Sequence, residues 1–157
     1  MPSNKFYLRR SASRTALALA ILAFLGFLDA TFLTASHYLH FPLPCSIVNG
    51  CEVVTTSAYS TIFGVPIALL GALYYLAMFL AAVAAWERKR PEILRIVFTL
   101  SALGLSVSLL LVFVQLVILG SICPYCMLSA VTTTAVFATA FWASPDFLLS
   151  GSTDPED

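Results

Sequence analysis

The chain has 157 residues, of which 60% are hydrophobic and only 10% charged, and its eight basic and eight acidic residues leave a formal net charge of zero. Soluble domains contain about 45–50% apolar and about 25% charged residues. This composition therefore excludes an ordinary soluble enzyme and predicts a membrane protein with no room for a separate soluble domain. The charge balance also gives no reason to expect nucleic acid as a partner.

Four long apolar segments follow one another along the chain, at residues 15–36, 62–85, 97–119 and 124–143. A helix needs about 20 residues to cross the hydrocarbon core, and lipid leaves no other way to satisfy the backbone polar groups of one segment. We therefore expect an all-α integral membrane fold, a bundle of four transmembrane helices over residues 1–144. The acidic tail at residues 145–157 is predicted to be disordered and cytoplasmic.

Basic residues lie on one side of the predicted membrane only. None occurs in the loop at residues 38–61 or in the turn at residues 120–123. The basic residues near the spans are Lys5, Arg9, Arg10, Arg14, Arg88, Lys89, Arg90 and Arg95. The positive-inside rule then predicts cytoplasmic N- and C-termini in a cell (inner) membrane, with the cysteines on the periplasmic or other exoplasmic side.

The first exoplasmic loop carries Cys45 and Cys51, with five residues between them, among the turn-forming residues Pro44, Asn49 and Gly50. Disulfides persist outside the cytoplasm and are rare within it. A loop of this length is usually functional. We interpret the pair as a movable dithiol that can reach a partner.

The second pair, Cys123 and Cys126, forms a CxxC motif where the fourth apolar segment begins. Pro124 suits the first turn of a helix, and residues three apart share a helix face, so the two sulfurs can meet. A helix N-terminus stabilises a thiolate, which is the reactive form of cysteine. The motif therefore predicts a redox-active dithiol fixed at the membrane surface.

The four cysteines also allow two other interpretations, a pair of structural disulfides and a zinc site. Two static disulfides are possible, but a CxxC bridge closes a very short loop and adds little stability. A four-cysteine zinc site is also possible, although such sites usually use two short-spaced pairs. The spacing and the compartment favour a redox relay over a metal-binding or assembly protein.

Three runs of the sequence resemble bacterial homologues of vitamin K epoxide reductase. They are Gly-Cys-Glu-Val-Val-Thr-Thr-Ser-Ala-Tyr-Ser at residues 50–60, Phe-Gly-Val-Pro-Ile-Ala-Leu-Leu-Gly at 63–71 and Ile-Cys-Pro-Tyr-Cys at 122–126. DsbB-type enzymes also have four spans and two cysteine pairs, but their CxxC lies in the first loop. Here the CxxC follows the third span, and the resemblance extends from about residue 15 to residue 143.

The resemblance implies a four-helix bundle around a quinone, with a short helix in the first exoplasmic loop capping the site. It implies that Cys126 lies next to the quinone, that Cys123 exchanges with Cys51, and that Cys45 exchanges with a separate thioredoxin-like (DsbA-like) protein. Ser57 matches a serine or threonine of the capping helix that stabilises the active cysteine or the quinone.

The expected cofactor is a respiratory quinone of the ubiquinone or menaquinone type. Animal vitamin K reductases carry a tyrosine four residues after the second CxxC cysteine, and this chain has Ala130 there. Two polar residues inside the spans are also noted. Asp29 is a functional candidate, because intramembrane acids usually are, and Gln115 is expected to hold helices together.

Overall fold

The computed structural model describes residues 3–41, 45, 50–88 and 91–143, so the predicted tail at residues 145–157 lies outside the described residues. The long helices are α1 (Ser3–Leu39), α3 (Ile67–Arg88), α4 (Pro91–Phe113) and α5 (Pro124–Ala143), and a π-helical segment, η2 (Val114–Ile118), extends α4. The shorter elements are α2 (Gly50–Thr55), the 3₁₀ turn η1 (Ala58–Ser60), β1 (Thr61–Ile62) and β2 (Val65–Pro66). The fold is the expected all-α membrane bundle.

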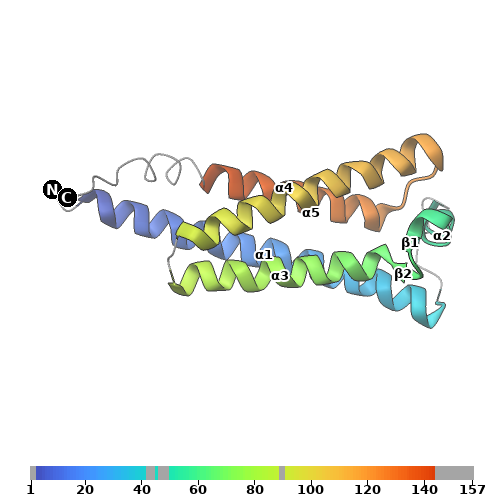
Figure 1. Cartoon of the computed structure of the whole chain (residues 1–157), viewed down its shortest axis with the longest axis horizontal. Coiled ribbons are helices and arrows are strands. Elements are labelled where there is room, and N and C mark those ends of the chain that lie inside the picture. Colours follow the sequence, from blue (N-terminus) through green and yellow to red (C-terminus); the bar gives the residue numbers. More distant parts are fainter. Residues whose placement is uncertain (1–2, 42–44, 46–49, 89–90, 144–157) are drawn as a thin grey trace.

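Each long helix contains a stretch that is long and apolar enough to cross a membrane, over Arg14–Leu39, Ile67–Glu87, Arg95–Ile118 and Pro124–Trp142. Both α1 and α4 pack against α3 and against α5, so the four helices form a closed bundle. The start of α1 and the end of α5 lie at one end of this bundle, and α2 with the two strands lies at the other (Figure 1).

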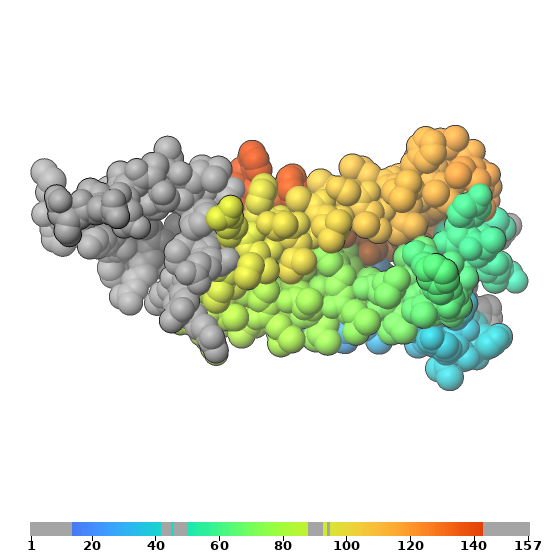
Figure 2. Space-filling model, viewed as in Figure 1, coloured from blue at the N-terminus to red at the C-terminus, as the bar shows by residue number. Residues whose placement is uncertain are grey.

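The short elements between α1 and α3 form a cap over that second end. Strands β1 and β2 pair antiparallel, Thr61 with Pro66 and Ile62 with Val65, around a two-residue turn. Phe63 and Gly64 have φ values of 51° and 80°, as a tight hairpin turn requires. The segment lies between the end of α1 and the connection from η2 to α5 (Figure 2).

The second long helix begins later than the sequence predicts. The apolar run predicts a helix from residue 62, but α3 begins at Ile67, because the hairpin turn at Phe63 and Gly64 lies between the two short strands β1 and β2. Periodicity cannot separate the two, since a short apolar strand and a helix start are alike in hydrophobicity.

The bundle interior changes along its axis. The half away from the cap is filled by a cluster of Leu19, Ala20, Ala23, Met78, Ala82, Val97, Val136 and Ala140. Nearer the cap, Tyr75 is buried against Gly26 of α1, where a Cβ would overlap its ring. The Tyr75 hydroxyl hydrogen-bonds with the hydroxyls of Ser129 (3.0 Å) and Thr133 (2.7 Å) on α5. This polar layer separates the apolar cluster from the capped end of the bundle.

Candidate active site

Cys45 and Cys51 form a disulfide, with Cα atoms 6.3 Å apart. Cys51 is the second residue of α2 and is only 2% exposed, whereas Cys45 is half-buried. Thr55 donates a hydrogen bond of 2.8 Å from Oγ1 to the Cys51 carbonyl oxygen, which fixes this short helix around the cysteine. A soluble thiol can thus approach the disulfide from the Cys45 side, while Cys51 faces the protein.

Cys123 and Cys126 are free thiols at the start of α5. The helix begins at Pro124, as the sequence predicts, so Cys123 precedes its first turn and Cys126 lies within it. Cys123 is fully buried, with 0% of its surface exposed. Gly120 has a φ of 57°, a conformation that glycine adopts without strain, and it turns the chain from η2 toward Cys123.

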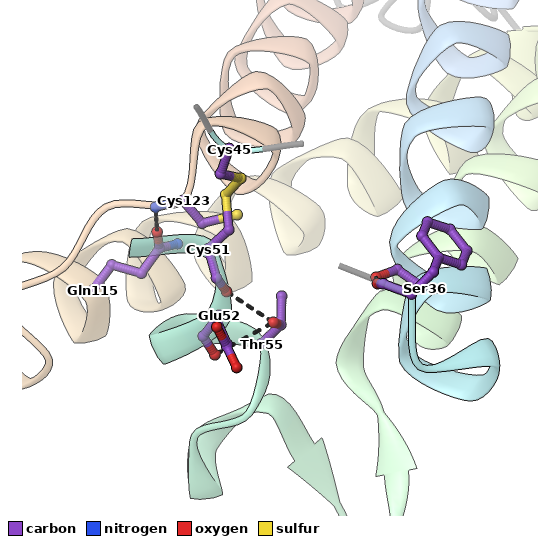
Figure 3. The surroundings of a disulfide bond; sticks show 8 residues. Ser36, Cys45, Cys51, Glu52, Thr55, Gln115 and Cys123 are labelled. Carbon is purple, nitrogen blue, oxygen red and sulfur yellow. Dashed lines mark hydrogen bonds between the residues drawn. A yellow bond between two sulfur atoms is a disulfide. The ribbon is translucent and has the colours of Figure 1, made fainter. Parts of the chain in front are cut away.

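The two pairs meet beneath the cap. Cys51 and Cys123 are buried in one apolar cluster with Val54, and Cys45, Leu119, Tyr125 and Cys126 pack against it. Figure 3 shows the Cys123 side chain pointing toward the Cys45–Cys51 disulfide. Thiol–disulfide exchange requires one sulfur to attack another directly. The arrangement therefore places a reduced dithiol and a disulfide in position to exchange.

Gly50 makes this approach possible. A Cβ at Gly50 would overlap the carbonyl oxygen of Ile122 and would lie 2.9 Å from its nitrogen. Backbone lies against backbone here, and neither side can move as a side chain would. The glycine before Cys51 therefore lets α2 approach the residue before Cys123.

The pKa of the Cys123 thiol is lowered to about 7, mainly because the Cys126 thiol hydrogen-bonds to it. The backbone N–H groups of Cys126 and Tyr125 act in the same direction, while burial and, least of all, Asp29 oppose them. An ordinary cysteine has a pKa near 8.5. The lowered pKa favours the thiolate of Cys123, and the thiolate is the form that attacks disulfides.

Gln115 has a role that the sequence did not reveal. Its Oε1 accepts a hydrogen bond of 3.0 Å from the Cys123 backbone N–H (Figure 3). Its own carbonyl oxygen accepts one of 3.1 Å from the Ser121 N–H. Gln115 is 4% exposed and lies in η2, a type of helix that is often found at functional sites. Expected to join helices, it instead holds the segment that carries the CxxC.

A cavity of about 160 Å³ opens below the cap, beside the second cysteine of the CxxC. Cys126 and Ser57 line it, as do Asp29 and Gln115, and most of the remaining wall is apolar. Ser57 also donates a hydrogen bond of 2.8 Å from Oγ to the Val54 carbonyl oxygen. An apolar cavity of about 150 Å³ is enough to hold benzene. This cavity therefore has room for one six-membered ring, and its wall suits a ring with polar substituents.

In the part of the chain that the structure describes, no three His, Cys, Asp or Glu side chains are grouped so as to hold a metal ion. Two of the four sulfurs are joined in the Cys45–Cys51 disulfide, whereas a Cys₄ site needs four thiolates.

A disulfide and a dithiol in contact within an apolar helical bundle can exchange electron pairs, and the fold and site together define a multi-pass membrane thiol oxidoreductase. The sequence model of the Vitamin K epoxide reductase family matches residues 17–141, and the chain belongs to that family. The match extends from the first long helix to the last. Members of the family use quinones and are generally linked to thioredoxin-like partners. A comparison with curated protein sequences finds no match.

Proposed function

We propose that this protein oxidises a thioredoxin-like exoplasmic protein and passes the electrons through its two cysteine pairs to a membrane quinone, in support of disulfide bond formation. The observation that carries the proposal is the shared burial of Cys51 and Cys123 in one cluster, with Cys126 on the wall of the cavity.

The first step takes place at Cys45, the more exposed sulfur of the loop disulfide. A thiolate of the partner attacks Cys45, a mixed disulfide forms, and Cys51 leaves as a thiolate. The partner's second thiol then displaces Cys45, so the partner leaves oxidised and the loop pair is reduced.

The second step is an exchange between the two pairs. The Cys51 thiolate attacks Cys123 of an oxidised Cys123–Cys126 pair, and Cys126 leaves with the electron pair. Cys45 then attacks Cys51, which restores the loop disulfide and frees Cys123. The structure, with the loop pair oxidised and the CxxC reduced, corresponds to the state after this exchange.

A bound quinone supplies the two-electron acceptor of the last step. Cys126 and Ser57 would lie beside its ring, because both line the cavity, and the apolar wall would exclude water. The proposed acceptor is a quinone of the ubiquinone or menaquinone type, and the cavity has room for one six-membered ring of its head group.

The basic residues of the sequence support the orientation in which both termini are cytoplasmic and the cysteines exoplasmic. In that orientation the cap faces the compartment in which disulfides form. After reduction, a membrane-impermeant maleimide should label Cys45, the more exposed cysteine of the loop pair, in intact spheroplasts. Labelling that requires permeabilised membranes would reverse the orientation.

The relay is tested by trapping the partner. In a Cys51→Ser variant, Cys45 can attack an oxidised thioredoxin-like protein but no second loop thiol resolves the product. A mixed disulfide should accumulate, and mass spectrometry would identify the partner. The matched control is Cys45→Ser, which should form none. If Cys51→Ser oxidised the partner as fast as the wild type, the relay would be wrong.

A further inference from the structure

Asp29 is a carboxyl group with no evident structural role. It is the only charged residue inside the four spans away from their ends, and it lies on the face of α1 that lines the cavity with Cys126. Its Oδ2 is buried and has no hydrogen-bond partner among the described residues. An unpaired polar atom in an apolar interior costs stability, and intramembrane acids are usually kept for function.

The titratable groups near Asp29 come from several elements, and none among the described residues is a hydrogen-bond partner of its Oδ2. Tyr75 on α3 lies within electrostatic range, but its hydroxyl is committed to Ser129 and Thr133. Cys126 on α5 and Cys123 before it are also within range. The other titratable groups that line the cavity are His37, two turns further along α1, and Tyr59 of η1, and α4 contributes none.

We propose that Asp29 is a catalytic proton carrier between the CxxC thiols and the bound quinone. This inference rests on the proposed function. Oxidation of the dithiol breaks two S–H bonds and forms the Cys123–Cys126 bond, while two electrons and two protons reach the quinone and form two O–H bonds. Asp29 gives its proton to one quinone oxygen and takes one from the thiol pair, while the second thiol proton passes to the other quinone oxygen, so the charge of Asp29 is unchanged after each turnover.

The geometry explains why a carrier is needed. Cys126 lines the cavity, but Cys123 does not, because it is fully buried between α2 and the start of α5. Cys126 donates the hydrogen bond that joins it to Cys123, so the proton that the pair gives up leaves from Cys126 and must cross the cavity. Asp29 lines the same cavity from α1, whereas Cys126 lines it from α5. Its Oδ2, which has no hydrogen-bond partner among the described residues, can accept that proton.

The experiment compares Asp29→Asn, Asp29→Glu and wild type, in detergent, with a short-chain ubiquinone. Thr34→Val is the matched control, because Thr34 lies on α1 and its hydroxyl donates a hydrogen bond to the Ala30 carbonyl oxygen of the same helix. General acid–base catalysis contributes about 10²–10⁴-fold, so Asp29→Asn should slow quinone reduction by about 10²-fold or more. Asp29→Glu should retain much of the rate, and Thr34→Val should match wild type. The Asn variant should also lose the fall in rate at high pH that a required proton donor produces.

Two measurements without turnover complete the test. Exchange between the cysteine pairs, followed without quinone, should be unchanged in Asp29→Asn. Dicyclohexylcarbodiimide, which modifies protonated carboxyls in apolar sites, should label Asp29 in wild type, and added ubiquinone should protect it. A rate for Asp29→Asn within about twofold of wild type, an equal loss of exchange, or absence of labelling would overturn the proposal. If wild type reduced no quinone, the proposed function itself would fail.

Discussion

The bond between Gln115 and Cys123 gives the sharpest prediction, because it joins a buried side chain to a buried backbone group next to the reactive sulfur. Gln115→Leu keeps the volume of the side chain but removes the acceptor Oε1, which lies 3.0 Å from the Cys123 nitrogen. Cys123 is 0% exposed, so no water replaces the lost acceptor. A buried donor left without a partner costs about 1–3 kcal/mol.

This cost can be relieved only if the segment that carries Cys123 moves toward water, away from Cys51. A penalty of about 1–3 kcal/mol corresponds to a factor of about 5–150 in an equilibrium. We therefore expect Gln115→Leu to slow exchange between the two cysteine pairs by a factor in that range. The assay follows the redox state of both pairs by alkylation and mass spectrometry after a pulse of reduced thioredoxin-like protein.

The matched control is Ser106→Ala, since Ser106 lies on α4, which η2 extends, and its hydroxyl donates a hydrogen bond to the Ala102 carbonyl oxygen of the same helix. It should exchange at the wild-type rate. Gln115→Glu retains an acceptor but adds a negative charge beside Cys123, so it should raise the pKa of that thiol. If Gln115→Leu exchanged as fast as wild type and lost no stability, the bond would not position the CxxC.

Three further outcomes follow from the same site. Gly50→Ala should separate α2 from Ile122 and slow exchange between the cysteine pairs, measured by the same alkylation assay. Gly64→Ala is the control for stability, since Gly64 has a φ of 80° but nothing lies within 4 Å of a Cβ there. Equal exchange rates for the two variants would contradict the argument that a Cβ at Gly50 overlaps Ile122. The pKa of Cys123 is lowered to about 7 chiefly by the hydrogen bond from Cys126, so in Cys126→Ala the pH midpoint of Cys123 alkylation should move upward, and an unchanged midpoint would refute that cause. Cys123→Ser leaves Cys126 as the only CxxC sulfur beside the cavity, so added quinone should produce a long-wavelength thiolate–quinone absorption; a band seen in Cys126→Ser instead would exchange the two roles.

Hydrophobicity predicted the bundle because each span is a long apolar run, but the helices differ from the predicted runs at several ends: α1 extends to Leu39, α3 begins at Ile67 and α4 begins at Pro91. Residues 62–66 are almost all apolar, so nothing but the turn at Gly64 distinguished strand from helix there. The start of α5 was predictable for a local reason, the proline after Cys123. These features depend on neighbours in the chain.

The contacts that build the site were not predictable in this way. Gly50 lies against Ile122, and Gln115 reaches the Cys123 nitrogen from a π-helical turn. Both depend on how distant segments or an irregular helix are placed, and no periodicity encodes them. The cavity is likewise a product of packing, although Asp29 was noticeable in the sequence as a lone intramembrane acid.

In the proposed orientation, the near-complete burial of Cys51 and Cys123 has a consequence for selectivity in the exoplasmic compartment. Small thiols and oxidants are present there, and any that reached Cys51 or Cys123 would react with these cysteines in place of the protein partner. Cys45 is the more exposed cysteine of the loop disulfide, so soluble thiols exchange with the protein at this one residue. The rate of unwanted reactions is then set by access to that residue alone, and a partner whose surface fits the cap gains an advantage over every small molecule with the same redox potential.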